Sequence, residues 1–128
     1  MNPLIKDFVV NKRKSHYDIY IGRGSKWGNP FKLEDYSRRD SILNYVLWLS
    51  EQPELLRDLP SLKGKVLGCY CAPKRCHGEV LALLANGHMT IDHLVKVARK
   101  ALYDVGLQII VDAELLSESR PLYDFTAN

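Results

Sequence analysis

At 128 residues, the chain has the size of a single domain that buries enough surface to fold without a disulfide or a structural metal. Its 46% hydrophobic and 26% charged residues are ordinary values for a globular protein, which excludes a disordered or a fibrous chain. No apolar run approaches the roughly 20 residues of a transmembrane helix, and the N-terminus has no signal-peptide core. We therefore expect a cytoplasmic protein with no membrane partner.

The net charge of +3 is distributed unevenly along the chain. Residues 1–39 contain nine Lys or Arg against four Asp or Glu, whereas residues 104–128 contain one Arg against five acidic residues. A basic first third attracts anions, and phosphate is the most obvious one. A solvated surface with uneven charge explains the same pattern equally well.

Three stretches are predicted to be strands. Residues 8–11 form a short apolar run, and residues 17–21 alternate before Gly22, so both are predicted to be strands and neighbours in one sheet. Residues 65–71 form an apolar run that is typical of a buried central strand, and this strand ends in cysteines.

The first helix is predicted from residue 40, where apolar positions begin to recur at helical spacing. Asp40 or Ser41 is expected to cap its start, and Pro53 is expected to follow its end. A shorter helical turn is predicted over residues 54–59.

Two more helices are predicted in the second half of the chain. One covers residues 77–85 and closes at Asn86 and Gly87, and the next is capped by Thr90. Residues 107–111 are predicted to be an edge strand or part of a helix. These elements predict an α/β fold in one domain, residues 1–128, with a short mixed sheet flanked by three or more helices and a helical C-terminal extension over residues 90–128.

Residues 21–31, the glycine loop, contain too many glycines for regular structure. Its glycines allow backbone amides to face an anion, and its arginine can bind a phosphate or carboxylate through two hydrogen bonds. Its tryptophan can stack on a base. The spacing matches neither a P-loop nor a dinucleotide-binding fingerprint, and a tight connection packed on the core is the structural alternative. The predicted ligand-binding residues are Arg23, Gly24, Ser25, Lys26, Trp27 and Asn29.

Residues 69–79, the cysteine segment, contain all three cysteines of the chain. Cys69 and Cys71 are two apart on a strand, so their side chains point to the same face, and a turn at Pro73 can bring Cys76 and His77 back over them. So tight a set suits a reducing compartment in which thiols serve a metal or a reaction rather than a disulfide.

Three interpretations of the cysteine segment stay open. The first is a zinc ion held by Cys69, Cys71, Cys76 and His77. The second is a reactive centre, with Cys76 as a thiol of lowered pKa and with His77 or Glu79 as an acid or base. The third is structural, because cysteine is often buried as a small hydrophobic residue.

The glycine loop and the cysteine segment together resemble the family known as domain of unknown function 4326, which occurs in phages and bacteria. The resemblance rests on Ile21-Gly-Arg-Gly-Ser-Lys-Trp-Gly-Asn-Pro-Phe31 followed by Gly64-Lys-Val-Leu-Gly-Cys-Tyr-Cys-Ala-Pro-Lys-Arg-Cys-His-Gly-Glu79, within a core of about residues 9–86. It implies a phage or bacterial origin, with the host cytoplasm as the location of a phage protein, and it implies one site shared by the two motifs.

Two functions of different classes follow from these patterns. The first is a small enzyme for transfer or hydrolysis at a glycosidic or phosphoryl bond of a nucleotide, nucleobase or modified base. Its catalytic residues would be Cys76, His77 and Glu79. The second is a non-catalytic zinc-containing module that binds a nucleotide signal, nucleic acid or a host protein. The predicted partner is therefore an anionic, nucleotide-like small molecule, with nucleic acid or a host protein as the alternative.

Overall fold

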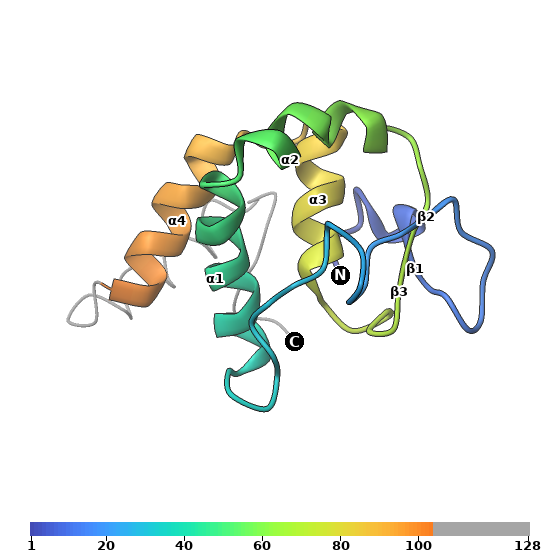
Figure 1. The fold of residues 1–128 in the computed structure, drawn as a ribbon, viewed down its shortest axis with the longest axis horizontal. Helices are drawn as coiled ribbons and strands as arrows, with labels where there is room; N and C mark the ends of the chain where they lie inside the picture. Colours follow the sequence, from blue (N-terminus) through green and yellow to red (C-terminus); the bar gives the residue numbers. More distant parts are fainter. Residues whose placement is uncertain (104–128) are drawn as a thin grey trace.

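The computed structural model describes residues 1–103, and they form a small parallel sheet beside a group of helices (Figure 1). The strands are β1 (Val9–Asn11), β2 (Ile19–Tyr20) and β3 (Leu67–Cys69), in the order β1-β3-β2. Both outer strands pair in parallel with β3, and Val9 and Ile19 lie opposite the same residue, Leu67. The α/β class is confirmed.

The sheet differs from the prediction in two respects. The pairing of the three described strands is parallel throughout rather than mixed, and β3 separates β1 from β2, which were predicted to be neighbours. The physical reason is burial, because all of β3 is buried and an apolar strand of this kind takes the centre of a sheet covered by helices. The three strands therefore end at the same edge of the sheet.

The helices lie together on one side of this sheet (Figure 1). In the described residues, α3 lies between α1 and the strands, and α4 packs against α1. The elements are η1 (Lys6–Phe8), α1 (Arg38–Ser50), α2 (Pro53–Asp58), η2 (Leu59–Leu62), α3 (His77–Ala85) and α4 (Ile91–Tyr103). None of these helices is long and apolar enough to cross a membrane.

Helix α1 begins earlier than the sequence pattern predicted. Its N-cap is Ser37, whose side chain accepts a hydrogen bond of 3.0 Å from the backbone N–H of Asp40. Neither Asp40 nor Ser41 caps the helix, since both lie within it, and the Ser41 hydroxyl donates to the carbonyl of Phe31 at 2.6 Å. The earlier start brings Arg38 into the first turn of α1.

The ends of α3 and α4 agree with the prediction. Helix α3 is followed by Asn86 and Gly87, and Gly87 has the positive φ of 77° that glycine adopts readily. The hydroxyl of Thr90 accepts a hydrogen bond of 3.1 Å from the backbone N–H of His93 at the start of α4. Residues 107–111 and most of the predicted C-terminal extension lie outside the described residues.

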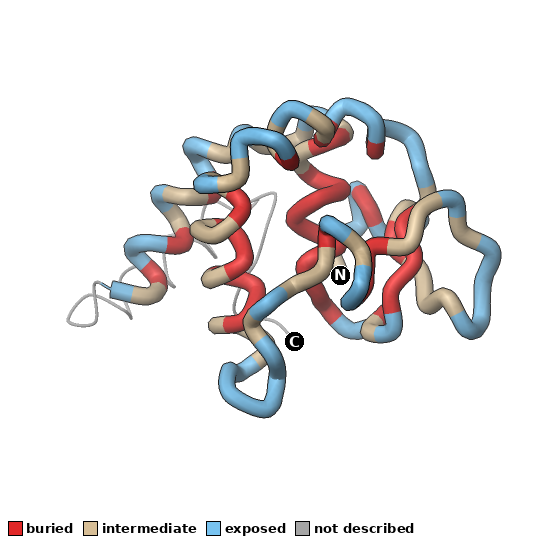
Figure 2. Tube along the Cα trace, in the orientation of Figure 1, coloured by how far each residue is buried: buried red, intermediate tan, exposed pale blue. Residues whose placement is uncertain are grey.

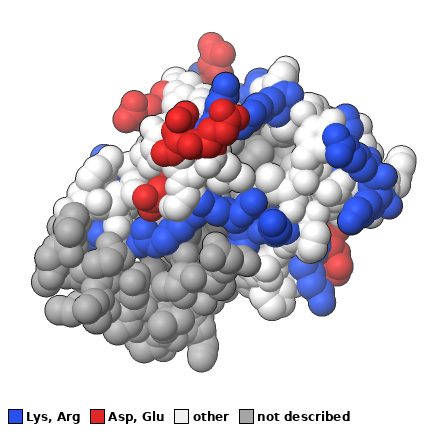
Figure 3. All heavy atoms as spheres, turned by 90° about the horizontal axis from the view of Figure 1, so that it is seen from below, with Lys and Arg blue, Asp and Glu red and all other residues white. Residues whose placement is uncertain are grey.

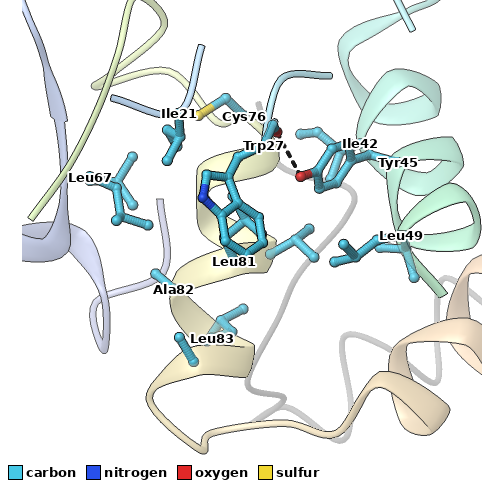
Figure 4. Close-up of a cluster of buried hydrophobic side chains, with 14 of the residues drawn as sticks. Ile21, Trp27, Ile42, Tyr45, Leu49, Leu67, Cys76, Leu81, Ala82 and Leu83 are labelled. Carbon is cyan, nitrogen blue, oxygen red and sulfur yellow. Dashed lines mark hydrogen bonds between the residues drawn. The ribbon is translucent and has the colours of Figure 1, made fainter. Parts of the chain in front are cut away.

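The core lies between α1 and the sheet, and α3 runs through it. Figure 2 shows α3 buried along nearly its whole length. In the close-up, Trp27 lies against α3 beside Leu81, and its backbone carbonyl accepts a hydrogen bond of 2.7 Å from the Tyr45 hydroxyl (Figure 4). The glycine loop is therefore fastened to the core by its own tryptophan.

Candidate ligand-binding site

A cavity of about 420 Å³ opens where the strands end and helices α1 and α3 begin. Both sequence motifs contribute to its wall, which confirms that the fold brings them together. In parallel sheets covered by helices, ligands bind in the crevice beyond the carboxyl ends of the strands. The volume lies within the range of roughly 300–1,000 Å³ that is usual for small-molecule sites.

The three cysteines form one cluster in the wall of this cavity. The Sγ atoms of Cys69 and Cys76 lie 3.4 Å apart, and the Cys71 thiol is close enough to interact with both. Cys69 is the last residue of β3, and Cys76 is the N-cap of α3, where its sulfur accepts the backbone N–H of Gly78 at 3.4 Å. The strand and the helix thus bring distant parts of the segment into one cluster.

The electrostatics single out Cys71 within the cluster. Hydrogen bonds from the Cys69 and Cys76 thiols, and then from the Arg38 guanidinium, lower the pKa of Cys71 well below its usual range. The contact with Cys71 raises the pKa of Cys69, whereas contacts with Cys69 and then with Cys71, together with burial, raise the pKa of Cys76. Cys71 is also the only half-buried cysteine of the three, so the thiol of lowered pKa in this arrangement is Cys71 rather than the predicted Cys76.

His77 faces the same cavity from the first position of α3. Its Nε2 lies 2.7 Å from the backbone carbonyl of Ile21, so Nε2 carries the proton and donates it. Burial lowers the pKa of His77, which keeps the imidazole neutral, and the ring packs edge-on against Tyr45. The bond to Ile21 ties the glycine loop directly to the cysteine segment.

Glu79 lies away from the cavity, in a buried ion pair. Its carboxylate is 0% exposed and accepts hydrogen bonds of 3.1 and 3.0 Å from the Arg75 guanidinium. It also accepts the backbone N–H of Asn2 at 3.1 Å. Glu79 therefore holds Arg75 and the N-terminal segment in place, in contrast to the predicted role as an acid or base.

The residues of the glycine loop divide between the cavity and the rest of the molecule. Arg23 and Asn29 line the cavity, but Gly24 and Ser25 do not. Ser25 instead donates to the carbonyl of Gly22 at 2.7 Å, which closes a local turn. Gly24 has a φ of 92°, a backbone conformation that glycine adopts readily, so this residue sets the shape of the loop.

Lys26 and Trp27 point away from the cavity in different directions. Lys26 forms an exposed ion pair of 2.7 Å with Asp58. Trp27 is only 3% exposed and packs in the core, so the predicted stacking on a base is not available to it in this structure. The structure thus agrees with the structural alternative for this residue, in which Trp27 packs on the core.

Several cavity residues were missed by the sequence patterns, and Arg38 matters most. Its guanidinium donates to the backbone carbonyl of Arg75 at 2.8 Å and also contacts the Cys71 thiol. The spacing Ser37-x-x-Asp40 resembles a capping box and would have located the helix start, and with it Arg38. The aromatic wall, formed by Tyr20, Phe31 and Tyr70, carries no signal in the sequence that separates it from core residues.

The described residues give the predicted zinc site no support. No group of three or more Cys, His, Asp or Glu among residues 1–103 is arranged to hold a metal ion. His77 cannot complete a ligand set through Nε2 while that atom donates to Ile21. Zinc binding at the cysteine segment therefore stays a prediction.

Comparison with known proteins gives a family and no activity. Residues 9–87 match the family described as a domain of unknown function (DUF4326). An uncharacterised 12.4 kDa protein of Enterobacteria phage T4, from the nrdA–td intergenic region, is 37% identical over 82 residues, which cover 61% of this chain and 76% of that protein. An uncharacterised protein of Acanthamoeba polyphaga mimivirus is 32% identical over 85 residues, which cover 52% of this chain and 65%, just under two-thirds, of that protein.

No solved structure matches the chain significantly. The matched range agrees with the predicted core of about residues 9–86 and contains both motifs that form the cavity. The chain belongs to the family of the domain of unknown function 4326.

Proposed function

We propose that the cavity binds a nucleotide, nucleobase or modified base and that the chain is an enzyme acting on it. The observation that carries this proposal is the composition of the cavity wall, in which three arginines, three aromatic rings and a thiol cluster face one space. A few polar groups in a mainly apolar pocket are the usual composition of a small-molecule site. The arginines suit a phosphate, and the rings suit a base.

Of the three cavity arginines, Arg75 is paired with Glu79, and Arg23 and Arg38 come from different parts of the fold. Arg23 is an exposed residue of the glycine loop, and Arg38 lies in the first turn of α1, where the helix dipole also favours an anion. Arg38 is already oriented by the carbonyl of Arg75, so its position is set before a ligand arrives. A phosphate between these two side chains would be held on both sides.

Cys71 is the reactive group in this proposal. It is half-buried, whereas Cys69 and Cys76, which also line the cavity, are buried. A cysteine in this position can act as a nucleophile, because two thiols and a guanidinium stabilise its negative charge.

The covalent step is displacement at carbon or phosphorus. A bond forms from the Cys71 sulfur to the anomeric carbon or to the phosphorus as the bond to the leaving group breaks. The leaving group takes the electron pair and a proton from solvent. Water then displaces the sulfur and supplies the oxygen of the product, so that hydrolysis is complete and Cys71 is restored.

Isothermal titration calorimetry with a ligand panel tests the binding part of the proposal. The panel contains ribonucleoside and deoxyribonucleoside mono- and diphosphates, the nucleosides, the bases and inorganic phosphate. Wild-type protein should bind at least one nucleotide more tightly than inorganic phosphate. The Arg23→Ala variant should bind that nucleotide about tenfold more weakly, since a hydrogen bond from a charged group contributes about 1.5–3 kcal/mol.

The matched control is Arg57→Ala, which removes the same charge from the exposed surface of α2, outside the cavity. Arg57→Ala should bind the nucleotide as wild type does. A panel without any bound nucleotide, or an equal loss in both variants, contradicts the proposal. Product formation is then followed by chromatography with wild type and Cys71→Ser, and the variant should lose turnover while it keeps nucleotide binding.

A further inference from the structure

A basic turn adjoins the cavity and takes no part in its wall. The turn connects β1 to β2 and consists of Lys12, Arg13 and Lys14. It is fixed to the cysteine segment, because the Lys12 backbone N–H donates to the carbonyl of Cys69 at 2.8 Å. The side chain of Asn11 adds hydrogen bonds of 3.2 Å to the carbonyls of Tyr70 and Ala72. The turn is therefore part of the framework that shapes the site.

Two cations of this turn, Lys12 and Arg13, lie against tyrosine rings that line the cavity. The Lys12 Nζ lies 4.6 Å from the centre of the Tyr20 ring and 5.2 Å from that of Tyr70. The Arg13 guanidinium lies 4.8 Å from the centre of the Tyr70 ring. Both tyrosines line the cavity, and Tyr70 is 48% exposed, so cations and an accessible aromatic ring meet at the cavity mouth.

The number of cations exceeds what one bound nucleotide requires. Arg23 and Arg38 already face the cavity and can hold the phosphate of a single nucleotide. The basic turn adds three more cations outside the wall. Figure 3 shows Lys and Arg side chains spread over the face on which α1 and α3 begin, beside a smaller group of Asp and Glu side chains. An anion with several phosphates in a row matches this distribution.

We infer that the substrate nucleotide is part of a single-stranded polynucleotide, with one nucleotide in the cavity, its flanking phosphates on the basic turn and a flanking base on Tyr70. This inference rests on the proposed function and names its substrate class. Positive grooves interleaved with aromatic rings are the common design of single-strand binding sites. A base inside a duplex is stacked and paired, so it could not enter the cavity without being extruded.

Fluorescence anisotropy with a short labelled single-stranded oligonucleotide tests the inference. Wild type should bind the oligonucleotide at least about tenfold more tightly than the best mononucleotide, because a flanking base and flanking phosphates add contacts that a mononucleotide lacks. The triple variant Lys12→Ala, Arg13→Ala, Lys14→Ala should lose this advantage. Its salt dependence should also be shallower by about 2, since each phosphate contact to a single strand contributes about 0.7 to the slope of log K against log salt.

The matched control is a triple variant with Arg57→Ala, Lys96→Ala and Lys100→Ala. It removes three exposed cations from α2 and α4, which contribute no residue to the cavity. The control should keep wild-type affinity and salt dependence. Tyr70→Ala should weaken oligonucleotide binding by about tenfold, at the lower end of the stacking range.

Three results would overturn the inference. The first is an oligonucleotide that binds no more tightly than a mononucleotide. The second is an equal loss of affinity in the two triple variants. The third is heparin or duplex DNA binding as tightly as the single strand, which would make the turn a general polyanion surface. In each case mononucleotide binding by wild type still tests the proposed function separately.

Discussion

The glycine loop and the cysteine segment face the same cavity, but they contribute to it in unequal ways. The cysteine segment supplies six of its nine residues from Cys69 to His77 to the wall. The glycine loop supplies only part of itself, with Arg23 facing the cavity while Trp27 packs in the core. The cysteine segment thus supplies mainly site residues, whereas the glycine loop supplies both site residues and a residue that anchors the loop in the core.

The difference shows that the type of a residue does not decide its role. Trp27 and Tyr70 are both aromatic and both lie in motifs, yet Trp27 is 3% exposed and Tyr70 is 48% exposed. The same holds for charge, since Arg23 faces the cavity and neighbouring Lys26 is paired with Asp58. Substitutions can therefore separate residues that hold the loop from residues that meet a ligand.

The largest effect is expected for Trp27→Ala. Truncation of a buried aromatic side chain leaves a void in the core and should lower the free energy of unfolding by about 3–5 kcal/mol, as measured by urea denaturation. A variant that unfolds like wild type but loses nucleotide binding would instead make Trp27 a stacking residue. Trp27→Phe, which keeps an aromatic ring, should lose clearly less stability than Trp27→Ala.

Glu79→Gln tests whether this residue of the cysteine segment is structural. The change removes the carboxylate charge from a buried pair with Arg75, and the free energy of unfolding should fall by about 3 kcal/mol. Glu34→Gln is the matched control, because Glu34 is exposed in the connection before α1. Wild-type stability of Glu79→Gln together with lost turnover would restore the catalytic role that the sequence suggested.

The smallest effect is expected for Lys26→Ala. The ion pair with Asp58 is about half exposed on each side, and exposed pairs of this kind contribute about 0–1 kcal/mol. Both the free energy of unfolding and nucleotide affinity should therefore stay close to wild type. A large loss of affinity, measured by calorimetry, would place Lys26 with Arg23 among the ligand contacts.

The sequence was sufficient for the α/β class, for most helices and for the joining of the two motifs at one site. It failed on strand order, because β1 and β2 are both short and nothing local shows that β3 inserts between them. It failed on Glu79 because the pairing with Arg75 depends on burial of both side chains in the folded protein. Whether a side chain points toward a cavity or into the core depends on the tertiary structure, which residue spacing and composition do not determine.

The identity of the reactive cysteine likewise depends on how the folded protein buries its side chains. The sequence places all three cysteines in one segment and favoured Cys76, but the fold buries Cys69 and Cys76 and leaves Cys71 half-buried beside Arg38. Identification of Arg38 required the start of α1, which the capping pattern at Ser37 determines.

Alkylation of Cys71 tests the central claim most directly. Wild-type protein is treated with iodoacetamide, with and without a saturating amount of the best nucleotide of the panel, and each cysteine is quantified by mass spectrometry. We predict that Cys71 reacts faster than Cys69 and Cys76 and that the nucleotide slows its reaction. Equal labelling of Cys71 with and without the nucleotide, or faster labelling of a buried cysteine, would contradict a nucleotide site at the thiol cluster.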